Sequence, residues 1–414
     1  AQRLRSNGVG STSRSQGLRI LQIAIGGVVA LLLAIVIAAL VALTAGCGSS
    51  SSSGGSMLTK VGDGEKQLNL VVWAGYAENG STDKTVDWVS GFTKETGCVV
   101  QSKTAATSDE MFSLMQTGQY DGVSASGDAS VRMIDAGLVA PVNVDLVSNY
   151  ADISSFLKDQ PYNSSGGKHY GIPHGWGANY LMYNSKVVTT APDSWGAVFD
   201  TNSPYKGKIT AYDAPISIAD AALYLKSAKP ELGIKDPYSL TQPQFDAAVE
   251  LLKGQHSVIG EYWNDYTKAQ SAFEQGTTVL GTTWQIIYNL AVANNADLKT
   301  VLPKEGATGW SDTWMISSKA AHPNCMYLWM NYITRPDVQS QVATWFGEAP
   351  ANPKACDVIG TSDATFCDVF KAKDAAFAQA ISFWATPRKK CLDGSGDSCV
   401  PFSEWIKAWT TIKG

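Results

Sequence analysis

The sequence predicts an α/β fold built as two lobes. Residues 67–73 (QLNLVVW) have the apolar run of a buried strand, residues 84–96 place apolar side chains near helical spacing before Gly97, and residues 98–101 form a second apolar run. Strand, helix and strand at this spacing form a βαβ unit, which begins a parallel sheet covered by helices. About 350 residues follow residue 65, more than one hydrophobic core usually holds, so we expect two lobes.

Short strands and helices continue along the rest of the chain. Residues 162–177 (YNSSGGKHYGIPHGWG) are rich in turn formers and precede an apolar segment at 179–183, so we place a crossing between the lobes here. We predict further helices at 109–116, 130–136, 218–227, 244–253 and 325–334, and further strands at 121–125, 279–284 and 314–317.

The N-terminal segment has the features of a lipoprotein anchor. An apolar run of about 26 residues ends in LTAGC (43–47), which places small residues before a cysteine whose thiol can accept lipid, and a Ser/Gly tract follows. We therefore expect residues 1–47 to be a signal or membrane-anchor segment with a lipobox, Cys47 to be the lipidation site and residues 48–65 to be a tether. The run is also long enough to span a bilayer, so an uncleaved helix is the alternative. Either interpretation predicts an extracytoplasmic body, in the periplasm or on the outer face of the cytoplasmic membrane, anchored to that membrane.

The charge of the chain argues against one class of partner. Removal of the segment before Cys47 deletes four arginines and no acidic residue, so the formal net charge falls from −5 to −9. An acidic body is not expected to bind nucleic acid, because phosphates require a basic surface. The same charge is compatible with a cationic ligand.

Six cysteines remain after Cys47, an even number in an oxidising compartment, which predicts disulfide bonds. Fifteen pairings are possible. Short loops favour Cys356 with Cys367 and Cys391 with Cys399, which leaves Cys98 with Cys325. No CxxC motif occurs, which disfavours a zinc site or thiol redox chemistry.

The sequence contains none of the short motifs that mark common enzymes and nucleotide-binding sites. HExxH, GxSxG, GxxxxGK[ST] and a GxGxxG that opens a helix are all absent. The four histidines, at 169, 174, 256 and 322, include no pair with the spacing of metal ligands on one helix. We therefore predict a protein that is not an enzyme and that uses neither a metal nor a cofactor.

Tryptophan is unusually frequent, with 13 residues. Trp73 and Trp284 end predicted strands, and Trp310 precedes Ser311 and Asp312 in a predicted loop. The carboxyl ends of strands rim the ligand crevice of an α/β sheet, and the faces of indole rings attract cations. We expect these three at a ligand site, although any one of them could instead pack a core. Seven others lie in or beside predicted helices and are assigned to packing: Trp195, Trp263, Trp329, Trp345, Trp384, Trp405 and Trp409.

Eight segments stand in the same order as in one protein family: QLNLVVWAGYAENG, FTKETGCVV, YDGVSASGDASVRM, YGIPHGWGANYLMYN, SWGAVFD, YKGKI, LPKEGATGWSDTWMIS and YITRPDVQSQVA. From Gln67 to about Pro353 the chain resembles the spermidine/putrescine-type extracellular solute-binding proteins of ABC importers. The resemblance implies a bilobed type II periplasmic-binding-protein fold, with the ligand in a hinged cleft and a membrane permease as partner. With the turn-rich segments, it places lobe I at residues 66–175 and 305–346 and lobe II at 176–304 and 347–414.

The resemblance also implies nine ligand-binding positions: Trp73, Tyr76, Ser126, Asp128, Asp213, Trp284, Trp310, Asp312 and Glu348. Asp312 matches the residue that binds an amine in the family. Three positions depart from the family pattern. Asp128 stands where an aromatic is common, Ser217 replaces a second carboxylate near Asp213, and the acid expected shortly after Trp284 is absent.

We expect the ligand to be a small cationic amine. Each buried ammonium needs a carboxylate or several acceptors to replace its hydration, and the predicted acids suffice for a diamine or a small quaternary amine. The expected partners are the permease subunits of an ABC importer, and we expect the protein to be a monomer. The alternatives are the same fold binding a sugar, ferric ion or another small solute, an extracellular sensor or adhesin without a permease, and a secreted hydrolase.

Overall fold

The computed structural model describes residues 57–414. The predicted anchor, Cys47 and most of the tether lie outside these described residues. Within residues 57–414, none of the helices combines the length and hydrophobicity needed to cross a bilayer.

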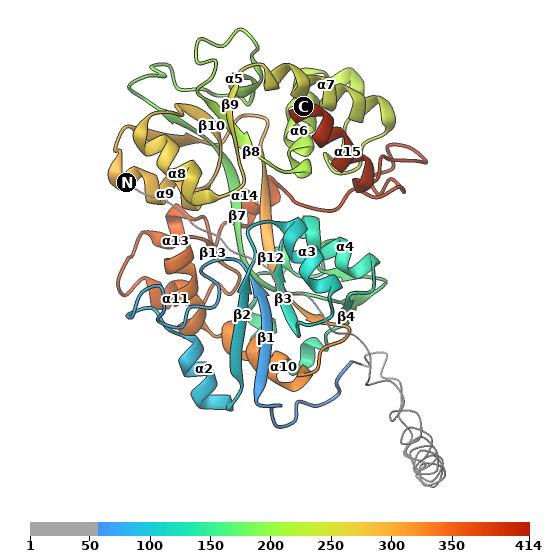
Figure 1. Ribbon diagram of the computed structural model, residues 1–414, viewed down its shortest axis with the longest axis vertical. Helices are drawn as coiled ribbons and strands as arrows, with labels where there is room; N and C mark the ends of the chain where they lie inside the picture. The colour runs from blue at the N-terminus through green and yellow to red at the C-terminus, as the bar shows by residue number, and fades with distance from the viewer. Residues whose placement is uncertain (1–56) are drawn as a thin grey trace, which may run out of the picture. The chain divides into compact units, whose positions relative to one another are not determined.

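One continuous sheet organises the described part of the chain (Figure 1), and eight of its strands lie in the order β2-β1-β3-β12-β7-β10-β8-β9. Its twelve strands are β1 (Gln67–Val72), β2 (Val99–Thr104), β3 (Gly122–Ala125), β4 (Val139–Ala140), β7 (Ile172–Asn184), β8 (Ile209–Tyr212), β9 (Ile259–Trp263), β10 (Leu280–Trp284), β11 (Leu298–Val301), β12 (Ala307–Ser317), β13 (Ala349–Pro350) and β14 (Ile381–Phe383). The short strands β5 (Ser164–Ser165) and β6 (Lys168–His169) form a separate hairpin.

The helices surround two groups of strands, β1 to β4 and β8 to β10 (Figure 1). The α-helices are α2 (Val89–Thr96), α3 (Ser108–Gln116), α4 (Gly127–Asp135), α5 (Gly196–Phe199), α6 (Ile218–Ala228), α7 (Gln242–His256), α8 (Tyr266–Gln275), α9 (Gln285–Asn294), α10 (Pro323–Ile333), α11 (Pro336–Phe346), α12 (Ala355–Ile359), α13 (Phe366–Val369), α14 (Ala375–Gln379) and α15 (Phe402–Lys413). Short 3-10 helices lie at Val144–Leu146, Tyr150–Asp152, Ser155–Leu157, Pro215–Ser217 and Pro230–Leu232. The predicted α/β class is confirmed.

The first βαβ unit is confirmed, because β1 and β2, which precede and follow α2 in the chain, pair in parallel. The helix is shorter than the 84–96 predicted. Asp83 accepts hydrogen bonds from the backbone and side chain of Thr85, and Asp87 accepts one from the backbone of Ser90. Aspartates that bind nearby backbone amides favour turns over helix, so α2 begins only at Val89.

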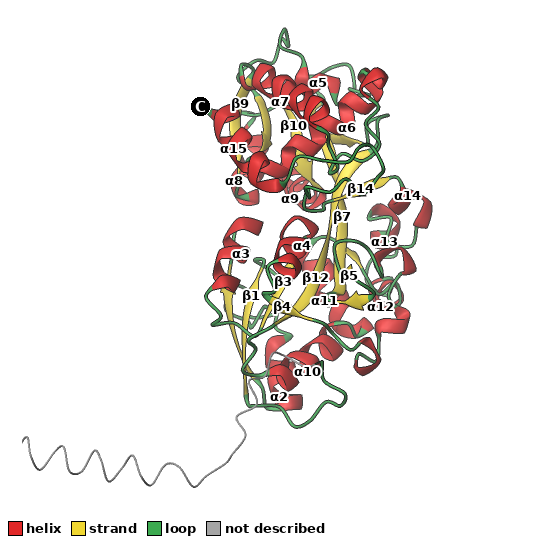
Figure 2. Cartoon of the chain, turned by 90° about the vertical axis from the view of Figure 1, so that its right-hand side faces the viewer, coloured by secondary structure: helices red, strands yellow, loops and turns green. Residues whose placement is uncertain are grey.

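The crossing between the two groups of strands occurs inside a strand. We predicted a loop up to residue 177, but β7 begins at Ile172 and extends through both groups (Figure 2). Its first half, to Ala178, pairs with β12, and its second half, from Asn179, pairs with β10. The glycines that suggested a loop instead allow close packing, because a Cβ at Gly177 would lie 2.8 Å from the ring of Trp310.

The strand predicted at 314–317 is also longer than expected. β12 begins at Ala307, and every residue of it is buried. Trp310 therefore lies within a strand, and our prediction of a loop there was wrong. The polar residues of this strand obscured it in the sequence, but β3 and β7 pair with it on both sides.

Three disulfide bonds join the predicted pairs: Cys356–Cys367 and Cys391–Cys399, which short loops favoured, and Cys98–Cys325, which remained. The first spans 227 residues and ties the start of β2 to α10. Gly64 packs directly on it, because a Cβ there would lie 2.4 Å from the Cys98 sulfur. This long bridge constrains the unfolded chain more than the two short ones.

The C-terminal segment pairs with both of the long strands, β7 and β12. β13 pairs with β7, and β14 pairs in parallel with β12 at its N-terminal end. The last helix, α15, packs against α7 near β8 and β9. The lobe boundaries given above stay a prediction.

Candidate functional site

A cavity of about 250 Å³ lies at the carboxyl ends of β1, β3 and β10. Trp73 follows β1, Ser126 follows β3 and Trp284 ends β10, and all three line the cavity. Strand ends of this kind rim the ligand crevice of α/β folds, so the position agrees with the sequence argument.

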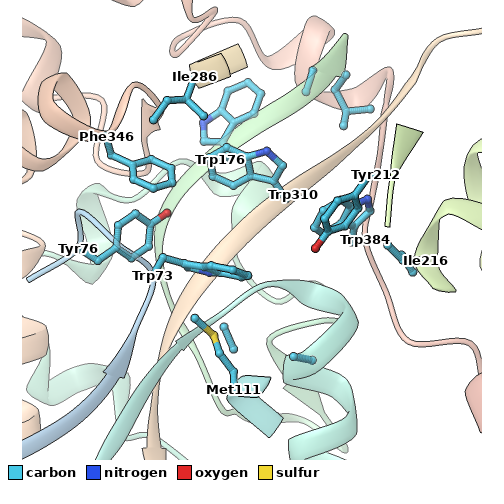
Figure 3. Packing of buried hydrophobic residues seen from close by; sticks show 14 of the residues in the cluster. Trp73, Tyr76, Met111, Trp176, Tyr212, Ile216, Ile286, Trp310, Phe346 and Trp384 are labelled. Atoms are coloured by element: carbon cyan, nitrogen blue, oxygen red, sulfur yellow. The ribbon is translucent and has the colours of Figure 1, made fainter. Parts of the chain in front are cut away.

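Six aromatic side chains line the cavity: Trp73, Tyr266, Trp284, Trp310, Phe346 and Trp384. Figure 3 labels four of them, Trp73, Trp310, Phe346 and Trp384. The rings of Trp73 and Trp284 meet edge to face with centroids 6.4 Å apart, and Trp384 stacks on Tyr212 at 5.7 Å. Such packing fixes the ring planes. A rigid wall of indole faces suits a cation or an apolar ligand body.

The polar lining residues are Thr104, Ser126, Asn264, Asp265, Thr267 and Asp312. Two of these are acids, and no Lys, Arg or His of residues 57–414 lines the cavity. The local charge of the cavity is therefore negative or neutral, never positive. This composition disfavours an anionic ligand and favours a cationic one.

A tight turn after β1 positions two of the predicted residues. The Tyr76 amide donates to the Trp73 carbonyl at 3.2 Å, and Gly75, the third residue of this turn, has φ +95°. A side chain at Gly75 would be strained and would also approach Phe346. The turn lets Trp73 face the cavity, whereas Tyr76 is buried behind it.

Asp312 is the deep acid of the cavity. It is 2 % exposed, and its carboxyl accepts hydrogen bonds from the Ser126 hydroxyl and, at 2.6 Å, from the Tyr76 hydroxyl. Burial raises the pKa of Asp312 to about 7, although the bonds from Ser126 and Tyr76 oppose the rise. The carboxyl has donors but no cation of its own.

Glu348 lies behind Asp312, away from the cavity lining. Its Oε2 atom is 2.6 Å from the Tyr76 hydroxyl, and its Oε1 atom is 3.7 Å from His174 Nε2. Room for this carboxyl comes from Gly175, where a Cβ would lie 2.1 Å from it. His174 is the unpaired residue of a bulge between β7 and β12, and bulges often turn a side chain toward a site.

Asp128 is buried in α4 but does not line the cavity. It accepts a hydrogen bond from the Ser108 hydroxyl at 2.8 Å, and burial raises the pKa of Asp128 to about 6. Its backbone carbonyl accepts from the Thr386 hydroxyl, so this part of α4 contacts the C-terminal segment. The structure supports a packing role for Asp128 more than a contact with ligand.

Asp213 follows β8 at the cavity's end of the sheet, but the protein itself satisfies it. Lys413 Nζ lies 2.6 Å from Asp213 Oδ1, and the Trp409 indole N–H donates to the same oxygen at 2.9 Å. Both partners come from α15. Asp213 is not among the cavity residues.

The structure brings five of the nine predicted positions to the cavity lining: Trp73, Ser126, Trp284, Trp310 and Asp312. It does not bring four others there: Tyr76, Asp128, Asp213 and Glu348. Of these four, Tyr76 contacts Asp312 directly and Glu348 contacts it through Tyr76.

Sequence reasoning missed two prominent lining residues. Trp384 was assigned to helix packing, but it follows β14 and its backbone N–H donates to the Gly309 carbonyl at 2.7 Å. Asp265 was missed because β9 was not predicted, so no strand end pointed to it. Its signal was local: Asp265 precedes Tyr266 as the N-cap of α8, and its carboxylate accepts from the Thr267 backbone and hydroxyl. The hydrogen bond from the Thr267 hydroxyl, and to a smaller extent the one from its backbone, holds the pKa of Asp265 below its usual value. Asp265 is therefore ionised at neutral pH.

No cluster of three or more His, Cys, Asp or Glu side chains with metal-binding geometry occurs among residues 57–414. The six cysteines in this range are all in disulfide bonds.

Comparison with known proteins gives a consistent result. The family of bacterial extracellular solute-binding proteins matches residues 87–383. The spermidine/putrescine-binding periplasmic protein of Escherichia coli K12 is 26% identical over 302 residues, covering 69% of this chain and 82% of that protein. A putative spermidine/putrescine ABC transporter from Listeria monocytogenes superposes with a TM-score of 0.69 at 18% identity, covering 84% of this chain and 99% of that one.

The substrate-binding protein PotD of Streptococcus pneumoniae superposes with a TM-score of 0.64 at 20% identity, again over 84% of this chain and 99% of that one. These structural matches confirm the predicted two-lobed fold. With a family match over more than half of its length, this chain belongs to the bacterial extracellular solute-binding proteins.

Proposed function

We propose that this protein binds a small cationic amine in the tryptophan-walled cavity and delivers it to the permease of an ABC importer. The observation that carries the proposal is Asp312, a buried carboxyl on the cavity wall that has hydroxyl donors but no cationic side chain beside it. A carboxyl in this state is stabilised when a ligand supplies the positive charge.

The physical chemistry of an ammonium fits this environment. An ammonium that enters a cavity loses hydration, which costs several kcal/mol unless acceptors replace the water. Asp312 supplies an acceptor with opposite charge, and each indole face supplies a cation–π attraction of about 0.5–2 kcal/mol. The name of the Escherichia coli relative, a spermidine/putrescine-binding protein, supports the same ligand class.

The number of acids favours a short amine. Asp312 lies in the interior of the cavity wall, and Asp265, at the N-terminus of α8, is the second acid of the lining. A monoamine would use Asp312 alone, and a diamine would place its second ammonium at Asp265. A longer triamine would need a third acid, and residues 57–414 bring no third acid to this lining.

The sequence supports a lipid-anchored, extracytoplasmic location with Cys47 as the modified residue. Metabolic labelling with a palmitate analogue tests this: we expect label on the wild-type protein and none on Cys47→Ser. Label retained on Cys47→Ser would contradict the site. An unlabelled wild-type protein that stays membrane-bound would favour the uncleaved helix.

We propose that the protein acts as a monomer, which light scattering would test.

A calorimetric panel tests the ligand class. Putrescine, n-butylamine, choline and glucose are titrated into the purified protein, and the same ligands are used in thermal unfolding, since binding to the native state alone raises stability. We expect heat and a higher melting temperature with at least one amine and none with glucose. Asp312→Asn should abolish the response, and Asp213→Asn, the same chemical change outside the cavity, should keep it. Binding of glucose without binding of any amine would contradict the proposal.

A further inference from the structure

Three buried groups form a chain behind the cavity wall. The Tyr76 hydroxyl lies 2.6 Å from Asp312 Oδ2 and 2.6 Å from Glu348 Oε2. All three side chains are at most 2 % exposed. Both distances are those of short O–H···O hydrogen bonds.

The count of protons in this chain is fixed by chemistry. A phenol hydroxyl has one hydrogen, so Tyr76 donates a hydrogen bond to one carboxyl and must accept a hydrogen bond from the other. If both carboxyls were ionised, one of the two short contacts would join oxygens with no hydrogen between them. At least one of the two acids therefore holds a proton.

The surroundings decide which acid holds it. Asp312 accepts a second hydrogen bond, from Ser126, and it borders the cavity. Glu348 has no second donor, and its Oε1 atom is buried without a hydrogen-bond partner. An ionised carboxylate needs several donors, so the charge is better placed on Asp312 and the proton on Glu348. Burial raises the pKa of Glu348 well above its usual value, which agrees with a protonated Glu348.

No nearby group supplies a positive charge to Glu348. The titratable side chains that face it are Tyr76, Asp312 and His174, and burial lowers the pKa of His174 to about 3, so the imidazole is neutral. None of the Lys and Arg ion pairs in residues 57–414 includes Glu348 or Asp312.

We propose that Glu348 is a positioning residue that stays protonated, donates its hydrogen to Tyr76, and through Tyr76 stabilises the ionised form of Asp312 toward the cavity. The deep end of the site then carries at most one negative charge rather than two. What this charge means for the ligand rests on the proposed function. This end accepts one ammonium, and a doubly charged group such as a divalent metal ion is not favoured there.

The first test needs no ligand and uses Glu348→Gln, whose amide N–H₂ can replace the carboxylic O–H as donor to Tyr76. A carboxyl with a raised native pKa is protonated when folded and ionised when unfolded, so the stability of the wild type falls as pH rises above the unfolded value of about 4.3. Glutamine has no such dependence. The melting temperature of Glu348→Gln minus that of the wild type should therefore increase by several degrees from pH 5 to pH 8. A difference that is constant or shrinks over this range would overturn the proposal.

The second test uses the amine that binds best in the panel. Glu348→Gln should keep its dissociation constant within about threefold of wild type, whereas Asp312→Asn should weaken binding at least about 30-fold. Loss of binding in Glu348→Gln to the extent seen in Asp312→Asn would mean that an ionised Glu348 binds the cation. If no amine binds the wild type, the proposed function fails, and the pH dependence of unfolding still tests Glu348 independently.

Discussion

Asp312 and Asp213 are two acids that the sequence suggests for the same role and that the fold treats in opposite ways. Asp312 lies on the cavity wall, and its partners are the neutral hydroxyls of Ser126 and Tyr76. Asp213 lies just after β8, and its partners are the ammonium of Lys413 and the indole N–H of Trp409. The two acids differ in whether the protein provides a cationic partner. Lys413 provides one for Asp213, and no cationic side chain of residues 57–414 provides one for Asp312.

The contrast gives a physical criterion for a cation-binding acid. Burial raises the pKa of Asp312 to about 7, so the folded protein bears a cost for this carboxyl that a bound cation would remove. Asp213 bears no comparable cost to be removed by ligand, because a ligand would have to displace Lys413. An acid that the fold leaves without a cation is therefore the better candidate.

The largest effect is expected for Asp312→Asn. Removal of the charged partner of a buried ammonium costs about 2–5 kcal/mol, so amine affinity should fall at least about 30-fold in calorimetry. The free protein should not lose stability at pH 8, because a carboxyl with a raised pKa lowers stability as pH rises from its unfolded value of about 3.9 through about 7. A variant with unchanged affinity would show that the ammonium lies elsewhere.

The pH dependence of binding by the wild-type protein tests whether the amine binds the ionised form of Asp312. An amine stays protonated across pH 6–8, and it binds the ionised form of Asp312, whose pKa is about 7. Affinity should therefore rise by about tenfold from pH 6 to pH 8, with one proton released per ligand at the acid end. Titrations in buffers of different ionisation enthalpy measure this release. An affinity that falls with rising pH would contradict an ionised Asp312 as the ligand's partner.

Much of the fold was predictable because local patterns agree with it. The βαβ start, the two short-loop disulfide pairs and the strand end at Trp284 all follow from short-range signals in the sequence. The errors in β7 and β12 have one cause. The polar and glycine-rich parts of β7 and β12 are strands because each pairs with partners from distant parts of the chain, and a local pattern does not reveal such pairing.

The site was less predictable than the fold. Residues that resemble a family pattern and stand at strand ends, such as Trp73 and Ser126, lie on the cavity. Asp213 also stands at a strand end, but whether it is free depends on Lys413, which is 200 residues away in sequence and beyond the family match, which ends at residue 383. Trp384 comes from the same segment. Its approach to α4 requires Gly127, because a Cβ there would lie 1.8 Å from the Trp384 carbonyl oxygen.

Asp265→Asn tests an acid that lines the cavity, as Asp312 does, but that already has hydrogen-bond donors and remains in contact with solvent. Asp265 lines the cavity but is mostly solvated, and its carboxylate already accepts two bonds from Thr267. An exposed ion pair contributes about 0.2–1 kcal/mol, so putrescine affinity should fall by about two- to fivefold. Affinity for n-butylamine, which has no second ammonium, should stay unchanged. An equal loss for both amines would place the first ammonium, not the second, at Asp265.

The smallest effect on binding is expected for Asp213→Asn. The affinity for any amine should stay within error of wild type, since the carboxylate already has Lys413 as its cation and lies outside the cavity lining. Its effect should appear in stability instead. The Lys413 side chain is 36% exposed, so the ion pair is partly screened and its loss should cost about 0.5–1 kcal/mol, a shift of about 1–2 °C in melting temperature. Lys413→Met removes the other half of the pair and should also leave amine affinity unchanged if Asp213 has no part in binding. Tighter amine binding in Lys413→Met would instead mean that the lysine competes with the ligand for Asp213. Asp213 and Asp312 would then both be able to bind the ligand and would differ only in how strongly they do so.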